Sequence, residues 1–276
     1  MSVFDEPKID CHTHVFDPLR FSYRSDTFYR PAGQEIATAS QLLHLMDAYG
    51  VSGALVVGPN SGYASDNRCL LDALARGGGR LKGIAVVEPD ASAAELEGLK
   101  RNGVVGVAFN PTILGLDYYR RTRDLLARLA DLGLLLQIQV EKDQLLGLLD
   151  LIADSRVALV VDHCGRPDPE AGPDQPGFKA LLALGRSGRA AVKLSGYAKF
   201  SREPYPHRDA WPYVRALMEA FMPERCLWAS DWPFLRSTQR IDYGPLLTLM
   251  QTLVPDAEAR RKIFWHTPRR LFGFEL

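Results

Sequence analysis

The feature that most constrains the fold is a short apolar run that recurs eight times, each time followed by polar turn residues and a helical pattern. The runs are residues 8–12, 53–57, 81–87, 103–109, 134–140, 157–162, 191–195 and 226–230. Apart from the first, they are apolar at most positions and do not alternate strictly with polar residues, which is typical of parallel strands covered on both faces. We therefore predict eight parallel strands.

The segments between these runs carry helical spacing. Apolar side chains recur at intervals of three and four residues over 40–49, 118–132 and 210–221, which predicts amphipathic helices. Gly50, Gly133 and Gly188 stand where a helix commonly ends on a left-handed residue.

The number of strand–helix units indicates the fold class. Eight units in 276 residues, without a long linker or a shift in composition, predict an α/β protein with one (β/α)8 TIM barrel domain over residues 1–276. An open, doubly wound sheet is the alternative. It is disfavoured because no Gly-x-Gly-x-x-Gly motif follows the first run and the chain has no P-loop.

Charge and cysteine content narrow the class of partner. Lys plus Arg and Asp plus Glu number 33 each, so the chain lacks the broad positive field that binds nucleic acid or an anionic membrane. The first residues, MSVFDE, do not resemble a secretory signal, and no apolar stretch approaches the ~20 residues of a membrane-spanning helix. The four cysteines form no Cys-x-x-Cys pair. We expect a cytoplasmic protein that acts on a small molecule.

Four polar residues fall at the ends of predicted strands. His12 ends the first run and His14 lies two residues further on, so a continuing extended strand points both side chains to the same side. His163 follows the sixth run and Asp231 follows the eighth. Because a barrel carries its chemistry at the carboxyl ends of its strands, we expect these four residues to converge at one mouth.

Structural roles are the alternative for single residues. Asp231 alone could cap a helix, and Asp10 and Asp162 could either orient the neighbouring histidines or bind backbone groups. The other three histidines are expected to be structural: His44, His207 and His266.

The segments around these residues resemble a known family. They are residues 10–18 (DCHTHVFDP), 162–167 (DHCGRP), 192–196 (VKLSG) and 228–233 (WASDWP). They are similar to motifs of the amidohydrolase superfamily, and more narrowly of its branch of 2-pyrone-4,6-dicarboxylate lactonases and sugar lactonases. The resemblance covers essentially the whole chain, with the motifs in the family order.

The resemblance implies hydrolysis of a lactone by water. Asp231 would be the general base, and His12, His14 and His163 would polarise the carbonyl group. In the pyrone lactonases this cluster acts without a metal ion, whereas elsewhere in the superfamily the same strand end holds zinc. The fourth and fifth runs supply no bridging lysine, so two metals are not expected. We favour no cofactor, with one zinc ion on the same four residues as the alternative.

The resemblance also suggests substrate-binding residues. Ser61 and Tyr29 match positions in the family's loops that contact the substrate. Lys199 falls near where the pyrone lactonase has an arginine, and Gln139 stands where that enzyme has a tyrosine. Ala108 replaces an arginine of that enzyme, although a dicarboxylate is ordinarily held by arginines. We therefore hypothesise a lactone with fewer negative charges, such as a sugar lactone. Three arginines are candidates to compensate: Arg68, Arg166 and Arg236.

Two other functions stay open at this point. The first is a mononuclear-zinc hydrolase or a non-oxidative decarboxylase of the same superfamily, which would act on a small carboxylic acid. The second is a catalytically silent barrel that binds a ligand. The sequence sets neither the oligomeric state nor which loop would act as a lid.

Overall fold

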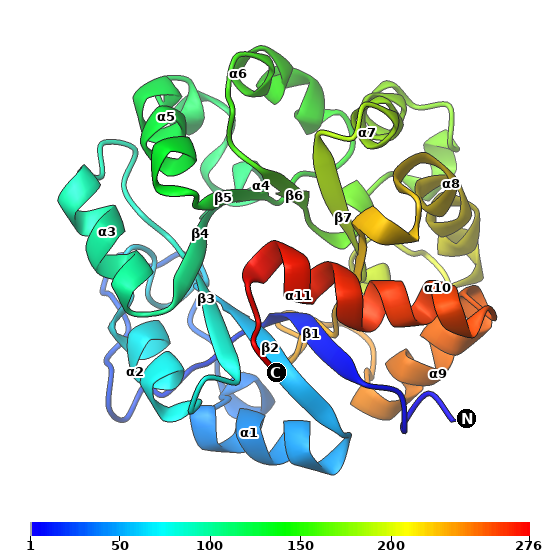
Figure 1. Ribbon diagram of the computed structural model, residues 1–276, viewed down its shortest axis with the longest axis horizontal. Coiled ribbons are helices and arrows are strands. Elements are labelled where there is room, and N and C mark those ends of the chain that lie inside the picture. The colour runs from blue at the N-terminus through cyan, green and yellow to red at the C-terminus, as the bar shows by residue number, and fades with distance from the viewer. Residues whose placement is uncertain (1) are drawn as a thin grey trace.

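The structure is a computed structural model that describes residues 2–276. Eight parallel strands form one sheet in chain order, which confirms the predicted (β/α)8 barrel (Figure 1). The strands are β1 (Lys8–Thr13), β2 (Val51–Val57), β3 (Leu81–Ala85), β4 (Val104–Phe109), β5 (Leu135–Ile138), β6 (Leu159–Val161), β7 (Ala190–Leu194) and β8 (Cys226–Trp228).

Helices surround the sheet (Figure 1). They are α1 (Ala39–Ala48), α2 (Arg68–Arg76), α3 (Ala93–Arg101), α4 (Pro111–Leu114), α5 (Arg123–Leu132), α6 (Leu149–Ala153), α7 (Pro176–Arg186), α8 (Trp211–Phe221), α9 (Tyr243–Leu253), α10 (Ala257–Arg261) and α11 (Thr267–Phe272). Gly50, Gly133 and Gly188 follow helices with φ of 63°, 65° and 74°, as predicted. Over residues 2–276, no helix combines the length and the apolar character that crossing a bilayer requires.

One helix is shorter than its sequence pattern predicts. The periodicity over 118–132 includes Tyr119, but α5 begins only at Arg123. Tyr119 lies in a 3-10 turn instead, where its ring stacks on Phe109 of β4 at a centroid distance of 4.2 Å and its hydroxyl accepts a hydrogen bond from the Asn110 backbone amide. Packing against the barrel overrides the local helical pattern here.

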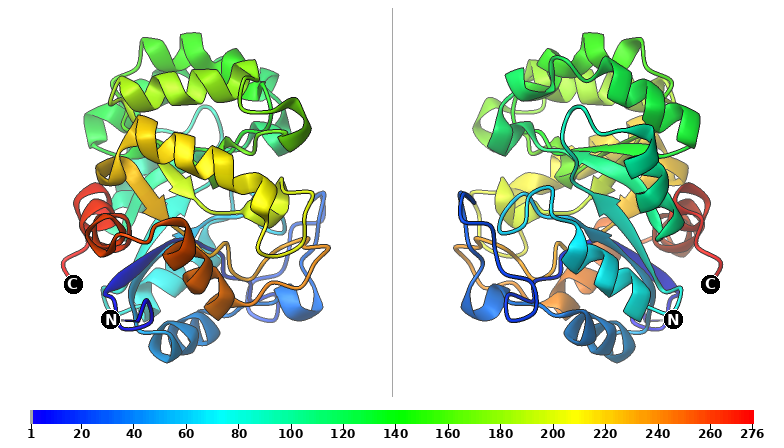
Figure 2. Two further views of the ribbon diagram at one scale, coloured as in Figure 1. Left: turned by 90° about the vertical axis from the view of Figure 1, so that its right-hand side faces the viewer. Right: turned by 90° about the vertical axis from the view of Figure 1, so that its left-hand side faces the viewer.

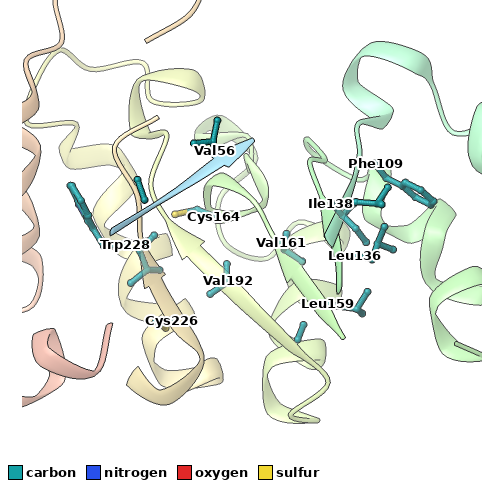
Figure 3. Close-up of a cluster of buried hydrophobic side chains, with 14 of the residues drawn as sticks. Val56, Phe109, Leu136, Ile138, Leu159, Val161, Cys164, Val192, Cys226 and Trp228 are labelled. Carbon is teal, nitrogen blue, oxygen red and sulfur yellow. The ribbon is translucent and has the colours of Figure 1, made fainter. Parts of the chain in front are cut away.

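The hydrophobic core has two layers. Outward-facing side chains such as Val192, Cys226 and Trp228 pack between the sheet and the helices (Figure 3). A second cluster fills the barrel interior and includes Leu55 together with Phe272 from the C-terminal segment. Because both faces of the strands are buried, their sequences are apolar at most positions.

The barrel is closed by β1 and the residues that follow β8. The Asp231 amide donates to the His12 carbonyl at 3.0 Å, and the His14 amide donates to the Trp232 carbonyl at 2.9 Å. We call this pair of hydrogen bonds the seam. Between Asp10 and Thr13, β1 has one residue more than β2 opposite it, which is a β-bulge of the kind that redirects side chains beside active sites. The seam therefore joins the two strand ends that carry the predicted histidine pair and aspartate.

The longest loops lie at one end of the barrel. The segments after β1, β7 and β8 gather at the end opposite to the two chain termini (Figure 2). This is the carboxyl end of the strands, where barrel enzymes carry their active sites.

Candidate active site

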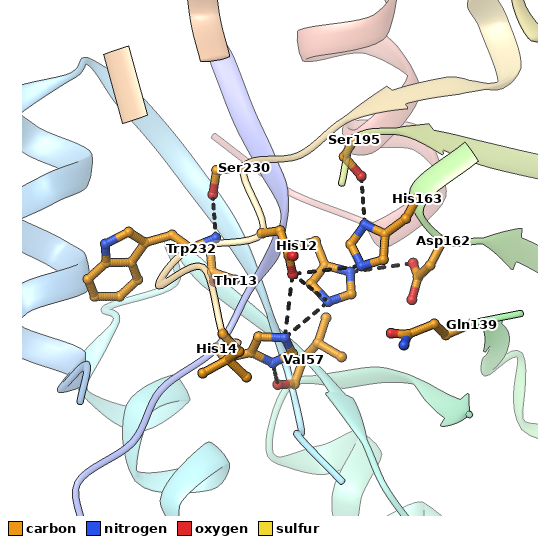
Figure 4. Close-up of polar contacts among 12 residues, drawn as sticks. His12, Thr13, His14, Val57, Gln139, Asp162, His163, Ser195, Ser230 and Trp232 are labelled. Carbon is orange, nitrogen blue, oxygen red and sulfur yellow. Dashed lines mark hydrogen bonds and ion pairs between the residues drawn. The ribbon is translucent and has the colours of Figure 1, made fainter. Parts of the chain in front are cut away.

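Four side chains from three strand ends converge at this mouth. Figure 4 labels the three histidines among them. The Nε2 atoms of His12 and His14 lie 3.3 Å apart. Asp231 Oδ1 lies 3.8 Å from each of these atoms and 3.7 Å from His163 Nε2. All four residues are buried. The predicted convergence is therefore present in the structure, and we refer to these four residues as the mouth cluster.

Unusual backbone geometry positions two members of the cluster. His163 and Asp231 have φ of 49° and 63°, in the left-handed region that residues other than glycine seldom adopt. The Asp231 conformation is held by the seam and by the Phe234 amide, which donates to the Asp231 carbonyl. Strained conformations of this kind concentrate at functional sites.

Second partners orient the imidazole rings. His14 Nδ1 lies 2.7 Å from the Val57 carbonyl, which can only accept, so Nδ1 carries the proton and Nε2 faces the cluster as an acceptor. His163 Nδ1 lies 3.0 Å from Ser195 Oγ. Both contacts are drawn in Figure 4. Each ring thus presents its Nε2 atom to the space beside Asp231.

Asp10 and Asp162 have different roles. Asp10 accepts hydrogen bonds from the backbone amides of His12 and Ser230 and from the Tyr243 hydroxyl, so it binds the two sides of the seam. Asp162 instead contacts a side chain of the cluster, with its Oδ1 atom 3.4 Å from His12 Nδ1. Of the two alternatives, Asp10 binds backbone groups and Asp162 contacts the histidine.

A fully buried lysine lies next to the cluster, and its role was not predicted from the sequence. Lys193 of β7 lies beneath His12, with its Nζ atom 3.1 Å from His12 Nδ1, 2.9 Å from Asp162 Oδ1 and 2.6 Å from Gln137 Oε1. The signal was present, because a lysine inside an apolar strand must have buried partners. Its partners come from three other strands and are not readable from local sequence.

Electrostatics give the cluster distinct protonation states. Burial lowers the pKa of His12 to about 3 and that of His163 to about 4, with Lys193 adding to the effect, and burial also lowers the pKa of His14. Burial works in the opposite direction on Asp231, but the positive charge of Lys199 and the neighbouring imidazoles hold its pKa well below the ordinary value. At neutral pH the cluster therefore combines neutral imidazoles with a carboxylate.

A pocket of about 480 Å³ opens above the cluster. Ser61, Gln139 and Lys199 line it, as their predicted role requires, and Lys199 Nζ lies 3.5 Å from Asp231 Oδ2. Tyr29 is not among the lining residues. Its hydroxyl donates to the Glu35 carboxylate, which makes Tyr29 part of the loop framework beside the pocket.

The structure separates the three candidate arginines. Arg166 and Arg236 line the pocket, whereas Arg68 pairs with Asp66 at the surface. Among residues 2–276 the buried Nε atom of Arg166 has no hydrogen-bond partner, and its Nη2 atom lies 3.5 Å from Glu141 Oε2.

The donor atoms of three residues of the cluster, His12, His14 and Asp231, are spaced as a single metal ion requires. Tetrahedral zinc with bonds of ~2.1 Å places its ligand atoms about 3.4 Å apart, and the relevant separations here are 3.3 and 3.8 Å. Two overlapping groups of residues can hold an ion, His12 with His14 and Asp231, and His12 with Asp162 and His163. His12 belongs to both groups.

Comparison with known proteins identifies the family. A family model described as Amidohydrolase matches residues 9–274, and the chain belongs to this family. The 4-sulfomuconolactone hydrolase of Rhizobium radiobacter is 34% identical over 274 residues, which cover 96% of this chain and 89% of that protein. The 2-pyrone-4,6-dicarboxylate hydrolase of Comamonas testosteroni is 31% identical over 277 residues, covering 96% and 89%.

A solved structure agrees with these relatives. The crystal structure of a probable 2-pyrone-4,6-dicarboxylic acid hydrolase from Acinetobacter baumannii, with citric acid bound, has a TM-score of 0.88 and 27% identity. The similarity covers 97% of this chain and 99% of that chain. These findings confirm the predicted family and its lactone-hydrolysing branch.

Proposed function

We propose that this protein hydrolyses a lactone with water as the nucleophile and Asp231 as the general base. The observation that carries the proposal is the buried Asp231 carboxylate within 3.8 Å of three imidazole Nε2 atoms. Asp231 takes a proton from water as the water oxygen attacks the lactone carbonyl carbon. The ring C–O bond then breaks, and the proton passes from Asp231 to the leaving oxygen. The products are a carboxylic acid, which loses its proton to solvent at neutral pH, and a hydroxyl or its keto form.

The histidines stabilise the oxyanion in this proposal. A carbonyl oxygen that becomes negative needs donors already aimed at it, and a neutral imidazole with a proton on Nε2 is such a donor. Loss of one donor of this kind typically costs 10²–10³ in kcat. At least one imidazole of the cluster must therefore carry its proton on Nε2.

We further propose that the reaction needs no metal ion. The alternative is one zinc ion, which His12, His14, His163 and Asp231 would hold and which would supply Lewis-acid polarisation of the carbonyl. The spacing of His12, His14 and Asp231 fits an ion, whereas His163 falls in the other group, with His12 and Asp162. The neutral histidines favour the metal-free reaction because they can serve as donors themselves.

The charges of the pocket suggest the class of lactone. Arg166, Lys199 and Arg236 supply three positive charges, whereas Glu141 and Asp231 supply two negative ones, and the lining carboxylate of Asp162 is paired with Lys193 beneath it. One positive charge is left, which suits a lactone with a single acidic group and agrees with the hypothesis of fewer charges than a dicarboxylate. The citric acid bound in the Acinetobacter baumannii structure supports recognition of carboxylates.

The four cysteines are buried and free, which supports the proposed cytoplasmic location. The proposed partner is a small carboxylated lactone, and neither nucleic acid nor a membrane takes part.

The test is hydrolysis of a panel of neutral, singly charged and doubly charged lactones by chelated and by zinc-supplemented enzyme. We expect activity that survives chelation and falls about 10²–10⁴-fold in Asp231→Asn, with the surface variant Asp242→Asn as the matched control. Activity restricted to the zinc-supplemented enzyme would replace the metal-free mechanism by the zinc alternative. Release of carbon dioxide from an aromatic or unsaturated acid, without lactonase activity, would favour a decarboxylase. Ligand binding without turnover would favour the silent barrel.

A further inference from the structure

Lys193 is the centre of a buried polar network under the mouth cluster. Its Nζ atom contacts three groups from three strands or strand ends: Gln137 Oε1 at 2.6 Å, Asp162 Oδ1 at 2.9 Å and His12 Nδ1 at 3.1 Å. The side chain is 0% exposed, so no water competes for these contacts. Gln137 also donates to Asp162 Oδ2 at 2.8 Å, which fixes the orientation of its amide.

The chemistry of the ammonium group determines the proton position on His12. A lysine ammonium beside a carboxylate has only donors and no lone pair. His12 Nδ1 must therefore accept the hydrogen bond from Lys193. Because a neutral imidazole carries one proton, that proton lies on Nε2, the atom that faces the mouth cluster.

The neighbouring residues agree with this proton position. His14 Nδ1 donates to the Val57 carbonyl, so its Nε2 atom is an acceptor and can receive the His12 Nε2 proton across their 3.3 Å separation. The opposite tautomer of His12 would have to donate from Nδ1 to Asp162 Oδ1. That oxygen lies 3.4 Å away and receives no well-directed hydrogen bond from residues 2–276.

We propose that Lys193 is a positioning residue that selects the Nε2-protonated tautomer of His12. The consequence is twofold. The tautomer provides the N–H donor that the proposed lactone hydrolysis requires at the mouth cluster, and in this respect the inference rests on the proposed function. In this tautomer His12 Nε2 carries a proton, so it has no lone pair available for a metal ion.

This arrangement differs from the usual support of a metal-binding histidine. Such a histidine donates its other ring N–H to a carboxylate, a backbone carbonyl or water, which leaves a lone pair for the metal. His14 has that arrangement here, with the Val57 carbonyl as acceptor. His12 has a cation in the same place, and both groups of residues that can hold an ion include His12.

The decisive experiment reads the tautomer directly. Nitrogen NMR of the native, chelated protein labelled with ¹⁵N-histidine distinguishes protonated from unprotonated ring nitrogens, and His12 is assigned by comparison with a His12→Gln variant. We expect His12 with Nε2 protonated and Nδ1 unprotonated, and His14 with the reverse. A native His12 protonated on Nδ1 overturns the proposal, whatever the activity of the enzyme.

A variant tests the cause. In Lys193→Met/Asp162→Asn the two opposite charges leave together, so no unpaired charge stays buried, and the amide oxygen of the new asparagine can accept a hydrogen bond from His12 Nδ1. We expect His12 to move its proton to Nδ1, and zinc to bind about tenfold more tightly or better in competition with a chelator. Lys8→Met is the matched control, because Lys8 is the other fully buried lysine among residues 2–276 and lies at the opposite end of β1. An unchanged His12 tautomer and unchanged zinc affinity in a folded double variant would refute the role of Lys193.

The outcome is independent of the substrate. A native protein with the expected tautomer but without lactonase activity would contradict the proposed function and leave the inference standing. Lactone hydrolysis by a protein whose His12 is protonated on Nδ1 would support the proposed function and contradict the inference about Lys193.

Discussion

At the scale of single residues, the site depends on close packing around His163. Gly196 follows β7 with φ of 65°, and a Cβ atom at this position would lie 2.6 Å from the His163 ring. The glycine therefore serves two needs, a left-handed backbone and room for an imidazole. His163 cannot keep its position beside Asp231 if that space is filled.

We predict that Gly196→Ala reduces kcat at least tenfold by displacing His163. Gly133→Ala is the matched control, because Gly133 also has φ of 65°, but a Cβ atom there would meet no other atom of residues 2–276 within 4 Å. Both variants should lose about 1–2 kcal/mol of stability from backbone strain, as thermal unfolding will measure. Equal loss of kcat in the two variants would contradict the proposed packing role.

Arg166 lines the pocket, where its guanidinium charge suits an acidic group of the substrate. We predict that Arg166→Met raises KM about tenfold or more for singly charged lactones, since a hydrogen bond to a charged group contributes about 1.5–3 kcal/mol. Neutral lactones should keep their KM. Steady-state kinetics on matched neutral and acidic lactones measure the difference, with Arg68→Met as the surface control. An equal rise of KM for both lactones would mean that Arg166 supports the fold of the pocket.

The residues of the cluster were predictable from sequence because strand ends of a barrel meet at one mouth. His12, His14, His163 and Asp231 follow apolar runs, and this pattern was sufficient. The role of Lys193 was not predictable, because a continuous apolar run does not reveal which side chains point into the barrel. The loop residue Tyr29 was suggested as a pocket residue by resemblance alone, and the structure places it outside the pocket lining.

At the scale of elements, Asp10 connects β1, the end of β8 and α9. Its carboxylate accepts hydrogen bonds from the backbone amides of His12 and Ser230 and from the Tyr243 hydroxyl. The strands themselves were predicted to within a few residues, because apolar runs mark them. The shortened start of α5 was not, because it depends on the contact between Tyr119 and Phe109 across the barrel wall.

We predict that Asp10→Ala lowers the free energy of unfolding by about 3 kcal/mol, because three buried donors lose their acceptor and each such loss costs about 1–3 kcal/mol before relaxation. Activity should fall as well, since the seam aligns His12 with Asp231. Asp10→Asn is the control, because its amide oxygen can still accept from the two backbone amides. Denaturant unfolding of the three proteins gives the measurement, and a stable, fully active Asp10→Ala would refute the role of the seam.

At the scale of the whole molecule, buried neutral histidines make stability depend on pH. The pKa values of His12 and His163 are about 3 and 4, against 6.5 for an unperturbed histidine, and the pKa of His14 is also lowered. Below pH 6.5 the unfolded chain therefore binds protons that the folded protein does not, and stability decreases as pH falls. Asp10 acts in the opposite sense, because burial raises its pKa to about 6 from 3.8.

We predict a net loss of stability between pH 6.5 and 4, because three histidines outweigh one aspartate and each contributes up to about 1.4 kcal/mol per pH unit. Thermal unfolding of the chelated protein across this range measures the effect. His163→Gln should show a weaker dependence on pH. A melting temperature that is constant from pH 7 to 4.5 would contradict the predicted burial of neutral imidazoles.

The seam joins two segments that are synthesised at different times. The histidine pair is synthesised more than two hundred residues before Asp231. The hydrogen bond from the Asp231 amide to the His12 carbonyl can form only after both segments have been synthesised. A chain that ends before Asp231 thus contains the histidine pair but lacks the proposed general base. Only a molecule in which both segments are folded together can be active. A turnover assay therefore also measures the fraction of molecules in which the barrel is closed.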